Sequence, residues 1–148
     1  MDQRVYKGRV VFRGDFVKDS DGYYAVFSEQ GTSSSHMVAT KFLDAMARMP
    51  GCDGEDSDAV GAYTQVKLDE LDHLIGEDVF VDAFVSLPKN RWPKNWEGMD
   101  HPVCRLRGNL YGHKLVGLLW QKYAEHKILL AGFKKPVEWE CLYHHIMY

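Results

Sequence analysis

Apolar side chains recur at helical spacing in two long stretches of the chain. The stretches cover residues 36–49 and 110–130, so the pattern predicts two amphipathic helices. Pro50 stops the first helix, and Gly132 closes the second. A briefer helix is expected over residues 62–71.

β-Branched and aromatic residues between turn signals predict short strands around these helices. Residues 5–13 and 23–27 flank turns rich in Asp and Gly, which predicts a basic hairpin. Further strands are expected at 79–87, 102–106 and 139–148. The combined pattern predicts an α+β fold in which helices pack on one face of a small antiparallel sheet.

Composition narrows the class of protein. The chain has 148 residues, 45% hydrophobic and 26% charged, which is typical of one globular domain. No run of 18 apolar residues occurs, so we expect neither a transmembrane helix nor a membrane partner. Three scattered cysteines are too few for a disulfide framework, which favours an intracellular location, cytoplasmic or nuclear.

Charge is unevenly distributed along the chain. Residues 1–18 carry five basic and two acidic side chains, whereas residues 51–82 carry ten acids and one lysine. Residues 83–148 are basic again, with ten cations and five acids. This pattern excludes a uniformly basic nucleic-acid-binding surface and allows basic flanks around an acidic, metal-binding centre. An ordinary solvated surface with patchy charge would give the same pattern.

The acidic region contains the residues that are the best candidates for binding a metal ion and a nucleotide. Asp58 can hold Mg²⁺, which prefers oxygen ligands and substrate phosphates. Gly61 and Ala62 are small enough for backbone to approach a ligand, and Tyr63 can cover one face of a sugar. The alternative is an acidic, solvated loop that leads into a short helix.

Two other groups of residues suggest binding. Residues 89–96 interleave basic side chains with Trp92 and Trp96, which can stack on bases or pack against a neighbouring core. Two Cys/His pairs, at residues 101–104 and 141–144, have the spacing of zinc ligands. They lie far apart in the sequence, whereas a structural zinc site needs four converging ligands, so we do not expect one.

Several short segments follow one another in an order that is more specific than any one of them. They are residues 7–14, Asp58-x-x-x-Ala62-Tyr63-x-Gln65, residues 85–88, 102–106 and 110–114, Trp120, residues 132–133 and residues 141–143. The set spans nearly the whole chain. It resembles the reverse transcriptase domain of copia-type retrotransposons, in a branch that has Leu-Tyr-Gly-His where many members have Leu-Tyr-Gly-Leu.

The resemblance implies a fingers-and-palm fold, with residues 1–50 fingers-like and residues 51–148 palm-like. It implies RNA-directed DNA polymerisation, a nucleotidyltransferase reaction, with an RNA or DNA template-primer and deoxynucleoside triphosphates as partners. The implied cofactor is Mg²⁺, because two metal ions would activate the primer oxygen and stabilise the leaving pyrophosphate.

The resemblance also implies roles for individual residues. Asp58 would be the catalytic carboxylate that bridges both metals, and the carbonyl of Ala59 would be a lesser metal ligand. Tyr63 would block a ribose 2′-OH and so favour deoxynucleotides. The other nucleotide-binding residues that it implies are Ala62, Lys7, Arg13 and Lys114.

The chain also departs from the family pattern. It contains no Asp-Asp pair, which supplies the other metal ligands in the family, and Leu115 stands where many relatives have a glutamine. One carboxylate cannot hold two adjacent cations against their repulsion. We therefore expect a fragment of a retrotransposon polyprotein, truncated before the Asp-Asp motif and inactive alone.

An unpaired palm strand at 139–148 would favour self-association. The alternatives are a non-catalytic nucleic-acid-binding or structural remnant, and an unrelated α+β protein.

Overall fold

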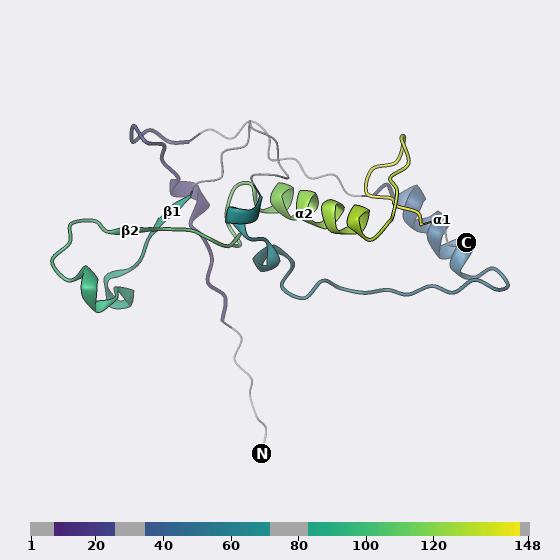
Figure 1. Cartoon of the computed structure of the whole chain (residues 1–148), viewed down its shortest axis with the longest axis horizontal. Helices are drawn as coiled ribbons and strands as arrows, with labels where there is room; N and C mark the ends of the chain where they lie inside the picture. The colour runs from purple at the N-terminus through teal and green to yellow at the C-terminus, as the bar shows by residue number, and fades with distance from the viewer. Residues whose placement is uncertain (1–7, 26–34, 72–82, 146–148) are drawn as a thin grey trace, which may run out of the picture.

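The computed structural model describes residues 8–25, 35–71 and 83–145 (Figure 1). Within these ranges the chain forms a small α+β arrangement. Its elements are α1 (Met37–Ala47), β1 (Phe84–Ser86), β2 (Val103–Arg105) and α2 (Val116–Leu130). Short 3-10 turns lie at Gly14–Phe16, Ala62–Gln65, Leu68–Glu70, Lys89–Arg91 and Lys94–Trp96. The predicted α+β class is therefore confirmed.

The hydrophobic core lies between the start of α2 and the segment 66–71. Val66 and Leu119 are fully buried, because apolar side chains four positions apart on α2 face that segment. The cluster comprises Val66, Leu68, Leu71, Leu115 and Leu119, with Leu106, Leu118, Trp120 and Tyr123 packed against it. A backbone bridge between Lys67 and Gly108 closes this core on its other side.

β1 and β2 form an antiparallel ribbon with Val85 opposite Cys104. These two side chains are half-buried, whereas Phe84 and Val103 on the other face are exposed, which follows the two-residue period of a strand. The ribbon and its loop extend away from α2 (Figure 1). Among the described residues neither α helix packs against the ribbon, so the predicted layer of helices on the sheet is wrong.

The chain after α2 folds back as an irregular hairpin. Gly132 ends the helix in a left-handed conformation, with φ of 93°. Lys134 and His144 then exchange two backbone hydrogen bonds of 2.8 and 2.9 Å. Residues 139–143 are not a strand, so the strand predicted at 139–148 is wrong for them; residues 146–148 lie outside the described ranges. Residues 139–143 therefore do not supply the unpaired strand on which the predicted self-association depended.

α1 is an amphipathic helix as predicted, yet it contacts no other helix or strand of the described chain. Only Ala39 is buried, while Phe42 is 56% and Met46 is 40% exposed. The helix thus forms where the apolar spacing places it, and no strand among the described residues packs against it as expected.

The N-terminal segment differs most from its prediction. Residues 8–13 form no strand, and the described part of the hairpin pairs Lys18 with Tyr24 instead. The Phe12 N–H donates to the Tyr111 carbonyl oxygen at 2.6 Å, so this segment crosses the turn before α2. The other boundaries also shift. The helix expected at 62–71 is two 3-10 turns, the strand expected at 79–87 covers Phe84–Ser86, and residues 79–82 lie outside the described ranges.

Candidate functional site

The turn that carries Tyr63 is organised by Gly61. Gly61 has a left-handed φ of 62°, which most side chains would resist. The Thr64 hydroxyl donates to the Gly61 carbonyl at 2.8 Å, and the Gln65 amide donates to the Val60 carbonyl at 2.9 Å. These local bonds fix the orientation in which the Tyr63 ring leaves the turn.

Asp58 lies just before this turn and is exposed to solvent. No group of three His, Cys, Asp or Glu side chains that could hold a metal occurs in the described part of the chain. The carbonyl of Ala59 accepts a hydrogen bond from the Ala62 N–H at 3.2 Å, which leaves one lone pair of that oxygen for another donor or ion. Within the described ranges, Asp58 and Ala59 are thus not joined by a group of further side chains that could complete a two-metal centre.

Three segments that are far apart in the sequence meet beside Tyr63. The Tyr63 ring contacts the Tyr111 ring edge-on, with centroids 4.9 Å apart. The Arg9 guanidinium lies over the Tyr111 ring at 5.3 Å. The result is a cation and two aromatic rings in one row, a combination suited to a flat, negatively charged ligand.

The N-terminal segment reaches this row through two glycines. A Cβ on Gly14 would overlap the Gly112 carbonyl oxygen, and a Cβ on Gly112 would overlap the Phe12 carbonyl oxygen. The side chain of Lys114 also reaches Gly14, with its Cε 3.8 Å from the position of that Cβ. Only glycine at both positions lets the two backbones cross so closely. We call this contact between residues 8–16 and residues 109–115 the crossing.

The predicted nucleotide-binding residues are only partly brought together. Ala62, Tyr63 and Lys114 lie on the two turns that meet, and Arg13 lies beside Gly14 at the crossing. The Arg13 guanidinium is occupied locally, because it pairs with Asp15 at 3.3 Å and lies over the Phe16 ring at 4.6 Å. Lys7 lies outside the described residues.

Two buried polar residues at the crossing were missed by sequence reasoning. The Asn109 side-chain amide donates to the Val116 carbonyl at 3.1 Å, which ties the turn to the first residue of α2. The His113 Nδ1 accepts the Leu115 N–H at 3.3 Å, and its ring lies 5.5 Å from that of Phe12. Burial lowers the pKa of His113 below its usual value, because the charged ring would lose its hydration. His113 stands in the Leu-Tyr-Gly-His segment, but nothing in the sequence indicated that either side chain would be buried.

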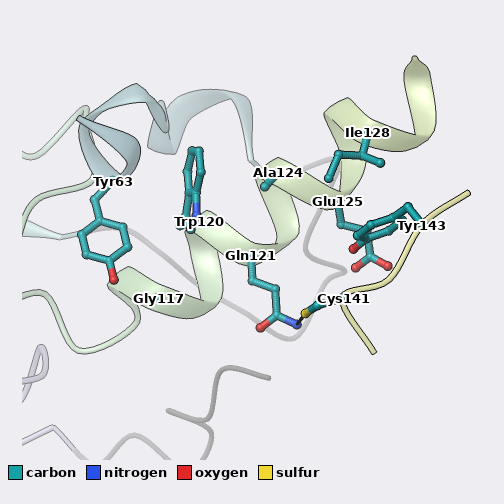
Figure 2. A pocket seen from close by; sticks show the side chains of 9 residues that line it. All are labelled: Tyr63, Gly117, Trp120, Gln121, Ala124, Glu125, Ile128, Cys141 and Tyr143. Atoms are coloured by element: carbon teal, nitrogen blue, oxygen red, sulfur yellow. Dashed lines mark hydrogen bonds between the residues drawn. The ribbon is translucent and has the colours of Figure 1, made fainter. Parts of the chain in front are cut away.

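A groove of about 350 Å³ runs along one side of α2 (Figure 2). Tyr63 stands at one end, Trp120 and Ile128 form apolar walls, and Cys141 with Tyr143 closes the far side. The remaining lining residues are Gly117, Gln121, Ala124 and Glu125. Tyr63 therefore belongs both to this groove and to the aromatic row at the crossing.

Three of the polar groups that line the groove, Glu125, Gln121 and Cys141, make side-chain hydrogen bonds. The Lys135 ammonium donates to the Glu125 carboxylate at 2.8 Å, and this bond raises the pKa of Lys135. Burial, with the nearby Glu125 charge, raises the pKa of Tyr143 above its usual value. The Gln121 amide donates to the Cys141 thiol sulfur at 3.9 Å. With its carboxylate held by an ammonium, the groove is suited to binding rather than to proton abstraction.

The two Cys/His pairs stay on separate parts of the fold. His101 and Cys104 belong to the ribbon, where the Cys104 thiol donates to the Val85 carbonyl at 3.7 Å. Cys141 and His144 belong to the hairpin after α2.

Comparisons with known proteins give no relative, since no protein-family model, curated protein or solved structure matches the chain. No helix in the described ranges is long and apolar enough to cross a membrane.

Proposed function

We propose that the chain is a fragment of a copia-type retrotransposon reverse transcriptase, descended from an RNA-directed DNA polymerase and inactive alone. The observation that supports this most is the meeting of three segments of the ordered motif set. Arg9, Tyr63 and Tyr111 come from three different segments, yet their side chains form one row. A nucleotide site assembled from these motifs requires such a convergence.

Inactivity follows from the metal ligands. In-line displacement by two cations needs several carboxylates to offset their mutual repulsion. The described residues form no group of three acid, His or Cys side chains around Asp58 that could hold a metal ion. We therefore expect no primer extension by the 148-residue chain with Mg²⁺ or Mn²⁺. Extension that Asp58→Ala abolishes would overturn this part of the proposal.

The descent itself is tested by nucleotide binding. We expect weak binding of a deoxynucleoside triphosphate, lost in both Arg9→Ala and Tyr63→Ala. Lys127→Ala is the matched control, because the Lys127 ammonium also lies 5.3 Å from a tyrosine ring, that of Tyr123, away from the crossing. Binding that is undetectable, or that Lys127→Ala weakens as much as Arg9→Ala does, would count against a nucleotide site here.

A second candidate function, binding of single-stranded nucleic acid, is favoured by the loop of the ribbon. The Trp92 indole N–H donates to the Leu87 carbonyl at 2.8 Å, which fixes the ring. Trp96 contacts Trp92 edge-on at 6.3 Å, and Lys89 lies 5.8 Å from the Trp92 ring. The two tryptophans thus pack on each other, and neither belongs to the core cluster of the described residues.

The cations of this loop are available to phosphates. Lys89, Arg91 and Lys94 are exposed, and none has a carboxylate partner within the described ranges. Fixed aromatic rings beside such cations are the usual elements of single-strand binding. Each stacked base is worth about 1–3 kcal/mol, so Trp96→Ala should weaken binding of a short oligonucleotide roughly tenfold or more.

Fluorescence anisotropy at several salt concentrations tests this candidate. Three phosphate contacts predict a log–log slope against salt of about −2, since each contributes roughly −0.7 on a single strand. Lys122→Ala, on α2, serves as a control that leaves the loop intact. Undetectable binding even at low salt would remove this candidate and leave the first unaffected.

A further inference from the structure

The crossing depends on a histidine whose protonation state is defined by its contacts. His113 is only 7% exposed, and its Nδ1 accepts the Leu115 N–H. An acceptor nitrogen carries no proton, so the ring is neutral with its hydrogen on Nε2. A proton on Nδ1 would set two N–H groups against each other and leave the Leu115 donor without its partner.

The ring of His113 is also where the N-terminal segment rests. Phe12 lies against it with ring centroids 5.5 Å apart, and the Phe12 N–H donates to the Tyr111 carbonyl next to it. Charging the ring would increase its demand for water at this contact. Movement of the segment that carries Phe12 would let more water reach the ring.

The surroundings offer little compensation for a charged ring. The charged side chains on the two crossing segments are Arg9, Arg13, Asp15 and Lys114. Asp15 is the one carboxylate among them, and it already pairs with Arg13. The first turn of α2 has no charged side chain, and its N-terminal dipole disfavours a cation. The turn at 61–66 contributes one titratable group, the phenol of Tyr63.

We propose that His113 is a proton-controlled latch, whose protonation releases residues 8–16 from the turn before α2 and removes Arg9 from the Tyr111 ring. This inference stands on the contacts of the crossing and does not require the function proposed above. It makes assembly of the aromatic row dependent on pH.

The direction of the effect follows from linkage. Burial lowers the pKa of His113 below the usual 6.5, so the open form binds a proton more readily than the latched form. The latch is fully closed above that usual pKa. Its stability falls as the pH drops below 6.5 toward the lower pKa of the latched form.

Amide hydrogen exchange of the whole 148-residue chain tests the latch. Protection of the Phe12 amide, corrected for the intrinsic effect of pH, is measured between about pH 8 and pH 5. We expect it to fall by up to about tenfold per pH unit, the limit for uptake of one proton. The Leu106 amide, which donates to the Ala83 carbonyl at 2.7 Å in the ribbon, should keep its protection.

Two variants identify the responsible group. In His113→Asn the side-chain oxygen can still accept the Leu115 N–H but cannot titrate, so protection at Phe12 should no longer depend on pH. His144→Asn, at an exposed position, should behave as the unmodified protein does. A pH-dependent loss that persists in His113→Asn would overturn the proposal.

A measurement on the unmodified protein remains decisive if His113→Asn does not fold. Nuclear magnetic resonance gives the titration midpoint of the His113 ring directly. Protection at Phe12 should begin to fall near pH 6.5 and stop falling at that midpoint, which lies below 6.5. Protection that is constant across this interval, or that keeps falling well below the midpoint of the ring, would refute the latch.

Discussion

Replacing Gly14 by alanine tests the packing at the crossing most directly. The new Cβ would overlap the carbonyl oxygen of Gly112 and lie 3.3 Å from its carbonyl carbon. Both atoms belong to the backbone, so no side-chain rotation can relieve the overlap. Gly8→Ala is the matched control, because a Cβ there would meet nothing within 4 Å. We expect Gly14→Ala to detach the N-terminal segment and Gly8→Ala to leave it in place.

The destabilisation caused by Gly14→Ala cannot exceed the free energy of the contacts that are broken when the segment detaches. The bond from the Phe12 N–H is worth about 1 kcal/mol, and the exposed contact of Arg9 with Tyr111 about 0.5–1 kcal/mol. Half-burial of the Phe12 side chain adds about 1 kcal/mol. Overpacking by one methyl typically costs 1–3 kcal/mol, which is close to this ceiling. We therefore expect a loss of about 2 kcal/mol, equivalent to roughly a 30-fold fall in protection.

Amide exchange separates local detachment from global unfolding. Protection should fall at Phe12 and stay unchanged at Leu119, whose amide donates to the Leu115 carbonyl at 2.9 Å in the core. If Gly14→Ala retains the protection that Gly8→Ala shows, the two backbones do not cross as described. An equal loss at Leu119 would mean that the segment is part of the core, which would refute the reasoning.

Three further predictions concern the core, the groove and the ribbon loop. Leu119→Ala removes a fully buried side chain and should cost about 3 kcal/mol by chemical denaturation; a cost below about 1 kcal/mol would place the core elsewhere. Glu125→Gln should lower the pKa of Tyr143 in an ultraviolet titration, because that carboxylate helps to raise it, while an unchanged pKa would mean that the Glu125 charge does not contribute. Trp92→Phe loses the indole bond to Leu87 and should destabilise the loop by about 1 kcal/mol, seen as faster exchange at the Arg91 amide.

The spacing of apolar residues predicted that the two helices exist, but it was less successful for where they begin and for what they pack against. α2 begins at Val116 rather than at residue 110, because Gly112 has a φ of 90° and turns the chain just before the helix. Periodicity counts apolar positions and does not register such a turn. α1 forms as predicted, yet its apolar face stays uncovered, since the pattern says which face is apolar and not what covers it.

The candidate site was predictable where it depended on local chemistry. The small residues before Tyr63 predicted a close approach of backbone to a ligand, and Gly61 has a left-handed backbone that begins the turn carrying Tyr63. The partners of Tyr63 were not predictable, because Arg9 was assigned to the first strand of the predicted basic hairpin. Its actual neighbour, Tyr111, is set by a backbone crossing about a hundred residues away along the sequence. Burial of His113 likewise arises only when that crossing forms.

Both the latch and the Gly14→Ala experiment require that the crossing can open while the core stays folded. Cooperative units in a protein open separately when few buried contacts join them. The core cluster lies around Leu119, and none of its members comes from residues 8–16. The segment is held instead by one short backbone bond, two ring contacts and the fit of two glycines. The free-energy cost of one added proton or methyl group is comparable with the stabilisation that these contacts give the crossing. It is small compared with the stabilisation that burial gives the core. Either change should therefore open the crossing and leave α2 folded.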